Sequence, residues 1–303
     1  MRLVECVPNF SEGRRKDVIE AIVAPFRGRN GCSLLDYRAD ADHNRLVVSL
    51  AGEPEPICDA LIEAALSARE HIDMNAHTGA HPRIGAVDVI PFTPIRNIAM
   101  DECVRLARDF GTRYHRETGI PVYFYEDAAT RPDRKRLEVI RKGQYEVLKM
   151  EVANTERHPD VGEPKLHPTA GATVIGARKF LVAFNINLGT SDVAVADTIA
   201  KTIRASGGGF PAVKAMGVDL AERGIVQVSM NIVDYEKADL YRILEVVRME
   251  AARYGVRVLD TEIYGMIPAD AILRSAAYYL QVKDFDPRQV LEVRLLESGG
   301  ASE

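Results

Sequence analysis

The chain has 303 residues, 47% hydrophobic and 27% charged, a balance that predicts a soluble globular protein of one large or two smaller domains. A formal charge of −5 argues against a nucleic-acid partner, because phosphate binding needs a concentrated basic face. No segment approaches the roughly 20 apolar residues that span a bilayer, so we expect no membrane role.

Hydrophobic periodicity in the first half predicts the order β-α-β-β-α-β. The predicted elements are a strand at 3–8, a helix at 15–26, strands at 32–37 and 45–52, a helix at 55–72 and a strand at 86–92. A helix at 100–118, a strand at 121–126 and a basic helical stretch at 131–142 follow. The polar, proline-bearing passage 154–169 is then expected to separate the two halves.

The second half predicts the same order. Its elements are a strand at 179–188, a helix at 193–206, strands at 212–220 and 225–234, a helix at 240–254, a strand at 257–265 and a helix at 268–280. The fold class is therefore α+β, with two tandem ferredoxin-like sandwiches at residues 1–178 and 179–303, each a mainly antiparallel sheet with helices on one face. The groove between two such sandwiches is the default place for a small ligand.

The loop before the strand at 86–92 carries the first candidate for chemistry. Pro82 pushes His81 out of the helical region, so His77 and His81 do not stack on one helical face and a zinc site is disfavoured. An imidazole with a pKa near neutrality is a natural general base. The alternative is that His81 only hydrogen-bonds backbone in a tight turn. Arg83 can bind an anion.

Three other segments offer ligand groups. A period of two places Asn185 and Asn187 on one face of their strand, where they would meet a polar ligand, a partner sheet or water, although Asn187 can also simply end the strand. Asn9 can cap the helix at 15–26, and the free backbone N–H groups there can hold a carboxylate. The basic run 131–142 is interpreted as a solvated helix face, with attraction of an anionic ligand as the alternative.

The segment 161–180 (VGEPKLHPTAGATVIGARKF) is glycine-rich and is interpreted as a loop that leads into the Asn185 strand. Its glycines allow close backbone approach to a flat ligand, and Lys165, His167 and Arg178 offer donors. It lacks the glycine spacing and the Lys-Ser/Thr pair of a phosphate loop, so nucleotide binding is rejected.

Three segments in this order, VECVPNFSEG, HTGAHPRIGAVDVIPF and GATVIGARKFLVAFNINL, together resemble the glutamate formiminotransferase family. The resemblance is to a stand-alone form of the transferase half of formiminotransferase-cyclodeaminase and extends to about Leu296. It implies transfer of the formimino group from N-formimino-L-glutamate to N5 of tetrahydrofolate, in histidine degradation. Tetrahydrofolate is then a co-substrate, and no metal is expected.

The resemblance also implies site residues. The catalytic histidine falls on His81, in the motif His-Pro-Arg-Ile-Gly-Ala. The demands of the reaction, rather than the resemblance, suggest the supporting roles: both substrates are anionic, so Arg83 and Arg178 would hold their carboxylates. Asn185 or Asn187 would position the amidine, Asp88 would orient His81 or stabilise the amidinium, and His77 is a reserve base. The folate-binding stretch falls on Gly162, Glu163, Pro164, Lys165, Leu166, His167, Pro168, Thr169, Ala170 and Gly171. Animal members have a tryptophan where this chain has Ala170.

Other functions stay open at this stage. A folate-dependent glutamate N-formyltransferase would need the same groups, a non-catalytic folate-binding protein would keep only the groove, and a metal hydrolase would use His77, His81 and Asp88. The four cysteines show no paired spacing and predict a reduced, cytoplasmic protein. A homodimer is possible, and a separate cyclodeaminase is expected to act next.

Overall fold

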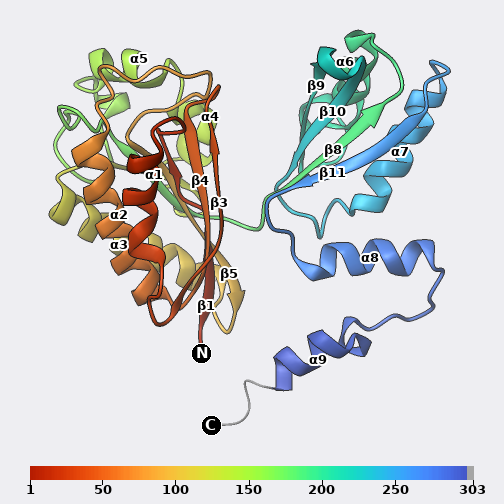
Figure 1. Cartoon of the computed structure of the whole chain (residues 1–303), viewed down its shortest axis with the longest axis horizontal. Helices are drawn as coiled ribbons and strands as arrows, with labels where there is room; N and C mark the ends of the chain where they lie inside the picture. The colour runs from red at the N-terminus through yellow and green to blue at the C-terminus, as the bar shows by residue number, and fades with distance from the viewer. Residues whose placement is uncertain (299–303) are drawn as a thin grey trace. The chain divides into compact units, whose positions relative to one another are not determined.

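The computed structural model describes residues 1–298 and divides into two compact units, one formed by Met1–Arg178 and the other beginning at Lys179 (Figure 1). The sequence suggested that the passage 154–169 separates the two units, but it does not. It lies inside the first unit, because the strand β7 (Thr173–Ala177) follows it and pairs in parallel with two other strands of that unit. Sequence reasoning missed β7 because its region is rich in glycine.

The first unit is built on a seven-stranded sheet. Its strands are β1 (Leu3–Cys6), β2 (Asn9–Phe10), β3 (Cys32–Asp40), β4 (Arg45–Gly52), β5 (Val87–Arg96), β6 (Val122–Glu126) and β7. The order along the sheet is β1-β4-β2-β5-β7-β6, with β3 on β4 and a further β1–β5 pairing. The β1, β3, β4 and β5 pairings are antiparallel, whereas β5, β7 and β6 run parallel. The expected mainly antiparallel sheet is confirmed, because five of its seven strand pairings are antiparallel, and the two parallel pairings of β7 were not foreseen.

Helices pack on both faces of this sheet (Figure 1). They are α1 (Lys16–Val23), α2 (Pro54–His71), α3 (Met100–Thr118), α4 (Leu137–Ile140) and α5 (Gln144–Glu151). The main core, which includes Ile22, Leu61 and Phe110, lies under α1, α2 and α3. A second, smaller core on the other side joins Ile140 of α4 and Leu148 of α5 to sheet residues. The prediction that helices cover one face only is therefore wrong for this unit.

The second unit has a four-stranded antiparallel sheet of order β11-β8-β10-β9. Its strands are β8 (Val182–Leu188), β9 (Val213–Leu220), β10 (Ile225–Ile232) and β11 (Val258–Tyr264), and its helices are α6 (Val193–Ile203), α7 (Leu240–Ala252), α8 (Ala269–Tyr279) and α9 (Leu291–Ser298). The alternating apolar residues of β8 join α6 and α7 in the core. The predicted two-residue period of this strand is confirmed, and α9 was not foreseen.

The two units share one strand arrangement. In the second unit the chain order β8-α6-β9-β10-α7-β11 places the fourth strand next to the first, the first next to the third, and the third next to the second. In the first unit the elements β1, α1, β3, β4, α2 and β5 give the same spatial order, β5-β1-β4-β3. The α+β class is confirmed, and β6 and β7 are additions that only the first unit carries.

The basic run 131–142 is not a continuous solvated helix. A 3₁₀ turn at Pro132–Lys135 and the four-residue α4 replace the expected helix. Arg134 is buried and pairs with Asp160 at 2.6 Å, and Arg141 pairs with buried Asp88. Arg134 is buried and Arg141 is half-buried, and each has a carboxylate partner, so the interpretation of this run as a solvated helix face fails for these two residues.

Among residues 1–298, no helix is both long enough and apolar enough to cross a bilayer.

Candidate active site

The three segments that carried the family resemblance meet at Gly85 and Ala86 in the first unit. From the N-terminal segment, the Ser11 hydroxyl donates to the Gly85 carbonyl at 2.8 Å and the Ser11 N–H donates to the Ala86 carbonyl at 2.9 Å. From the third segment, Gly171 forms an isolated β-bridge with Gly85, and the Ala172 N–H donates to the Ile84 carbonyl at 3.0 Å. Segments far apart in the chain are thus held together by buried hydrogen bonds, which are costly to leave unmade.

Two glycines permit this close approach. A Cβ on Gly85 would lie 2.0 Å from the Ala172 carbonyl oxygen, and one on Gly171 would lie 2.3 Å from the Ile84 carbonyl oxygen. Gly171 also has φ +71°, a left-handed conformation that favours glycine. A side chain at either position would push the His81 loop, residues 77–86, away from the segment 162–171.

The segment 162–171 is exposed at its start and anchored at its end. Glu163 and Lys165 form an exposed ion pair at 2.8 Å, whereas Ala170 and Gly171 are buried. His167 accepts a hydrogen bond from the Ala170 N–H through Nδ1 at 3.0 Å, so its proton lies on Nε2. Burial lowers the pKa of His167, which keeps the ring neutral. This histidine therefore offers one N–H donor from an otherwise exposed loop.

Ala170 is fully buried within the main core, beside Tyr145. Its methyl side chain is fully buried, so this position offers no aromatic ring where animal members of the family have a tryptophan. The Tyr145 hydroxyl donates to Asn75 Oδ1 at 2.9 Å, and Asn75 in turn donates to the Pro168 carbonyl at 2.9 Å. These two residues hold the segment 162–171 in place.

His81 lies in irregular backbone, as Pro82 predicted, and its ring is half-buried. The ring nitrogens make no hydrogen bond with the residues that the structure describes, so the interpretation of His81 as a residue that only bonds turn backbone is not supported. Burial, together with the positive charges of Arg141 and Arg45, lowers the pKa of His81 to about 3. The expectation of a pKa near neutrality is therefore wrong for the free protein. The imidazole is neutral at pH 7, and its nitrogens are open to a ligand.

His77 is held by the protein at both ring nitrogens. Nδ1 accepts from Arg83 Nε at 3.1 Å, and Nε2 donates to the Asn44 carbonyl at 3.2 Å. Arg83 can only donate and a carbonyl can only accept, so these contacts fix the tautomer. Burial lowers the pKa of His77 as well. His77 is thus a structural residue rather than a reserve base, and its occupied nitrogens also count against the metal-hydrolase alternative.

Arg83 has no N–H donor left for a substrate. Its Nε and Nη2 reach the Nδ1 and carbonyl oxygen of His77, and its two Nη groups form a forked pair with Glu146 at 2.9 and 2.7 Å. Nη1 also donates to Gln144 Oε1 at 2.9 Å. The guanidinium is 6% exposed and all five donors are used, so the proposed grip of Arg83 on a substrate carboxylate is not supported.

Asp88 does not reach His81 directly. Its Oδ1 accepts from the Ile84 N–H at 2.8 Å, and its Oδ2 pairs with Arg141 Nη2. Burial raises the pKa of Asp88, and the charge of Arg141 opposes that rise. Asp88 therefore positions the end of the His81 loop and one nitrogen of Arg141. The sequence had suggested instead that Asp88 would orient the His81 ring itself.

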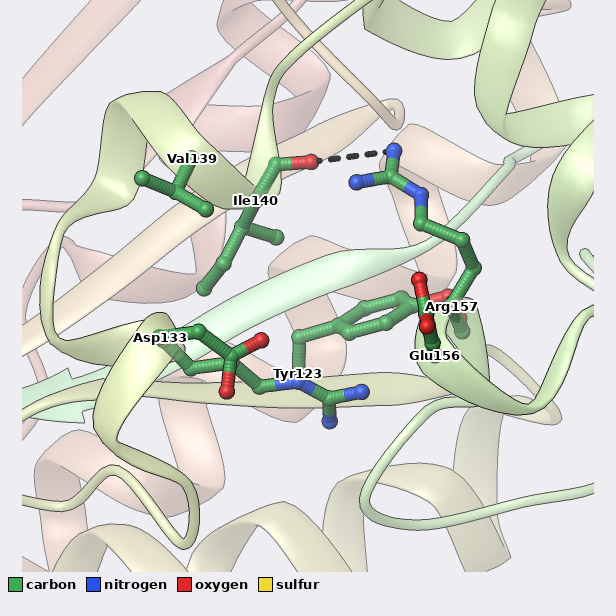
Figure 2. A pocket seen from close by; sticks show the side chains of 7 residues that line it. Tyr123, Asp133, Val139, Ile140, Glu156 and Arg157 are labelled. Atoms are coloured by element: carbon green, nitrogen blue, oxygen red, sulfur yellow. Dashed lines mark hydrogen bonds between the residues drawn. The ribbon is translucent and has the colours of Figure 1, made fainter.

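Arg157 holds the backbone on both sides of Arg141. Its Nη2 donates to the carbonyl oxygens of Ile140 at 3.4 Å and Lys142 at 3.1 Å, and Figure 2 shows the first of these bonds. The small cavity drawn there, lined by Tyr123, Asp133, Arg134, Val139, Ile140, Glu156 and Arg157, has a volume of about 20 Å³. That is room for about one water molecule, so it supports the Arg141 turn and is not a substrate site.

Arg45 is a residue that sequence reasoning missed. It begins β4, is half-buried, and its Nε is buried without a hydrogen-bond partner. Among the described residues its guanidinium has no hydrogen bond and no ion pair. The signal in the sequence is weak: Arg45 directly follows Asn44, a residue type that favours turns, and Asn44 does adopt a left-handed φ of +48° here.

Arg178 lies at the other end of the sheet. Its N–H donates to the Phe92 carbonyl at 3.0 Å, and its charge acts on Glu5 and Tyr125. His81 precedes Val87, at the start of β5, and the rise from Val87 to Phe92 is roughly 17 Å. Arg178 and His81 therefore do not form one site within the first unit.

Asn185 and Asn187 share one face of β8, as predicted, and both are buried. Asn187 donates to Asp260 at 2.6 Å and to Glu262 at 2.9 Å, and it accepts from Gln227 at 2.9 Å. Asn185 accepts only from the Met230 N–H, at 3.2 Å. Its amide N–H groups make no hydrogen bond with the described residues, so Asn185 is the better ligand candidate of the two.

Asn9 donates to the Val7 carbonyl at 3.0 Å and does not cap α1. The backbone N–H groups of Arg14 and Arg15 are instead satisfied by Glu12, both at 2.9 Å. Glu12, a carboxylate of the chain itself, therefore occupies the two backbone N–H groups just before α1.

The His81 imidazole is neutral, makes no hydrogen bond with the described residues, and lies on a loop held between two of the family segments. The guanidinium groups of Arg45 and Arg141, which act on it, have N–H donors that no described residue accepts from. Residues 3–178 match the N-terminal subdomain of the formiminotransferase domain, and residues 183–294 match the formiminotransferase domain. The chain belongs to the formiminotransferase family.

Relatives of the chain match it nearly end to end. It is 49% identical to a glutamate formimidoyltransferase of Streptococcus pyogenes over 97% of this chain and 99% of the relative. It is 46% identical to a glutamate formimidoyltransferase of Thermoplasma acidophilum over 97% and 98% of the two chains. A formimidoyltransferase-cyclodeaminase of Rattus norvegicus is 43% identical over 92% of this chain and 52% of its own length. The chain thus spans about half of that bifunctional relative.

Proposed function

We propose that this protein is a glutamate formimidoyltransferase, which moves the formimino group from N-formimino-L-glutamate to N5 of tetrahydrofolate and releases L-glutamate, in histidine degradation. The observation that carries the proposal is the meeting of the three family segments at Gly85 and Ala86, which leaves His81 without a protein partner. Two relatives named for this activity match the chain almost completely.

The reaction needs one proton to move between two nitrogens. N5 attacks the amidine carbon and loses a proton, and the glutamate nitrogen gains a proton as its bond to that carbon breaks. His81 is neutral in the free protein, so it can accept the first proton and deliver it to the leaving nitrogen. A bound carboxylate would raise the pKa of His81 and bring the imidazolium closer to neutral pH.

The folate is proposed to lie against residues 162–171, with the Nε2–H of the half-buried His167 as one donor. Asn185 remains a candidate for the amidine. The finer fold proposal is that the two units are tandem ferredoxin-like sandwiches with a ligand groove between them, and the strand order common to both units supports the first part. A cytoplasmic location fits four buried free cysteines, and a homodimer and a separate, following cyclodeaminase belong to the same proposal.

The test is an absorbance assay for 5-formiminotetrahydrofolate or its cyclised product, with N-formimino-L-glutamate and N-formyl-L-glutamate compared side by side. We expect turnover with the first donor only. His81→Ala should lower kcat by roughly 10²–10⁴-fold with little change in substrate affinity. His71→Ala, at an exposed histidine of α2, is the matched control and should keep full activity.

Turnover with the formyl donor alone would make the protein a formyltransferase. Tight folate binding with no transfer of either group would make it a non-catalytic folate-binding protein. Near wild-type kcat in His81→Ala would remove His81 from the mechanism.

A further inference from the structure

We propose that Arg45 and Arg141 form the subsite for the α-carboxylate of the glutamate-type donor, beside His81. The assignment of this ligand rests on the proposed function. The subsite itself rests on two guanidinium groups that the fold brings close to His81 and that keep N–H donors without an acceptor among the described residues.

Arg45 is the stronger of the two observations. A half-buried guanidinium without a counter-ion is unfavourable, and proteins usually supply such a group with a carboxylate. Here the nearby carboxylate of Asp40 is taken by His43, whose Nδ1 lies 2.9 Å from it. The five N–H donors of Arg45 therefore remain available for a planar anion.

Arg141 adds a second, fixed set of donors. Its side chain is only 12% exposed, Asp88 takes Nη2, and Nε is buried without a partner. Together with Asp88, the two arginines carry a net charge of +1, which one carboxylate would neutralise. Of the further groups whose positive charge acts on His81, Arg83 is already balanced by Glu146 and His43 is paired with Asp40.

The fold places His81 beside these arginines from two directions. On one side, the His77 ring and the Ala80 N–H bond to the backbone of the 40–44 turn that precedes Arg45, at 3.2 and 3.3 Å. On the other side, Ile84 bonds to Asp88, which holds Arg141. His81 sits on the loop between these two anchors.

The chemistry of the substrates decides which carboxylate fits. In the donor, the α-carboxylate is attached to the carbon that bears the departing nitrogen, so it must lie close to the group that transfers protons. In folate, the glutamate is separated from N5 by the whole aminobenzoyl group. A carboxylate bound next to His81 therefore belongs to the donor. Holding it would fix the leaving nitrogen against the imidazole.

The first experiment measures binding without catalysis. N-Formyl-L-glutamate is used as the probe in the absence of folate, and its Kd is measured by calorimetry for the wild type, Arg45→Gln and Arg141→Gln. We expect each variant to bind about 10–100-fold more weakly, the loss typical of a charge-assisted hydrogen-bond pair. Arg38→Gln in β3 and Arg136→Gln in the basic run are exposed controls that should bind within twofold of wild type.

The second experiment changes the ligand instead of the protein. The α-amide of the probe should bind the wild type about as weakly as the probe itself binds Arg45→Gln. Replacing Arg45 should then weaken the binding of the α-amide little further. The γ-amide should lose the same factor in both proteins. If Arg141→Gln unfolds because Asp88 is left unpaired, the double variant Asp88→Asn/Arg141→Gln removes both charges, and Arg45→Gln tests the subsite alone.

Wild-type affinity in Arg45→Gln and in the Arg141 variant would overturn the proposal. Weaker binding of folate but not of the probe, with pteroate unaffected, would assign the carboxylate to the folate tail and overturn it too. These binding results do not depend on turnover. A wild type that binds the probe through Arg45 and transfers no formimino group would refute the proposed function and leave the subsite standing.

Discussion

The polar clusters of the two units differ in how completely they are satisfied. In the second unit, Asn187, Gln227 and Glu262 bond to one another, and hydrogen bonds from Asn187 and Arg223 lower the pKa of Glu262 to about 2. In the first unit, His81 and Arg45 have no hydrogen-bond partner among the described residues. A satisfied network specifies structure, whereas unsatisfied groups that stay half-buried have a cost that a ligand can offset.

A second contrast lies inside the first unit, between two arginines near His81. Arg83 uses all five donors within the protein, and Arg45 uses none with the described residues. Arg83 lies two residues after His81 and looked like the substrate ligand, whereas Arg45 is distant in sequence. Nearness in sequence to a catalytic motif is therefore a poor guide to which cation is free.

The largest loss of stability is expected at Asp88, which bonds both to the backbone of Ile84 and to Arg141, a residue with a further N–H donor left without a partner. Asp88→Ala leaves Arg141 without its carboxylate and the Ile84 N–H without its acceptor. Breaking a buried ion pair by removing one partner should cost about 3–5 kcal/mol, or roughly 6–20 °C in Tm. Thermal unfolding measures this change in Tm, and Asp101→Ala, at an exposed carboxylate of α3, is the control. A Tm within 2 °C of wild type would contradict the structural role.

The second unit provides a comparison between neighbouring amides. Asn187→Ala removes the three hydrogen bonds of a buried amide and should lower the free energy of unfolding by about 1–3 kcal/mol. Asn185→Ala removes one and should cost less than about 1.5 kcal/mol. Urea denaturation of both variants decides it. Equal losses would mean that the hydrogen bonds of Asn187 do not set its contribution.

Arg83→Lys sharpens the contrast between the two arginines. Lysine cannot reproduce the planar fork to Glu146 or the bond from Nε to His77, so stability should fall by about 1–2 kcal/mol. The KM for the glutamate donor should stay within about threefold of wild type, because Arg83 has no donor free for substrate. Chemical denaturation and steady-state kinetics test the two parts separately. A large rise in KM with unchanged stability would restore Arg83 as a substrate ligand.

The smallest effect near neutral pH concerns the titration of His81. Its pKa is lowered in the folded protein, so between pH 6.5 and 3 the unfolded chain binds more protons and stability falls as the pH falls. The contribution is less than about 1 kcal/mol at pH 6, reduced further by solvent screening of the half-buried ring, and grows toward pH 3. His81→Gln should flatten the dependence of Tm on pH in this window. An identical slope in both proteins would show that the pKa of His81 is not lowered.

The element order was largely predictable from sequence, because hydrophobic periods report burial directly. The helix predicted at 100–118 is α3 itself, and the alternation in β8 separates its apolar and amide faces as expected. Prediction failed at β7, where glycine and proline flank only five strand residues. It also failed at 131–142, where two arginines turn inward to carboxylates far away in the chain.

The sequence by itself determined the family, the α+β class and the extended backbone at His81, because motifs, periodicity and the proline after that histidine are local properties. Only the tertiary structure decided which polar groups are free. Hydrogen bonds among Arg83, His77 and Glu146, and the ion pair of Asp88 with Arg141, join residues from different elements. Long-range pairing of this kind depends on the packed fold, and it is the reason for proposing Arg45 and Arg141, in place of Arg83, as ligands of a substrate carboxylate.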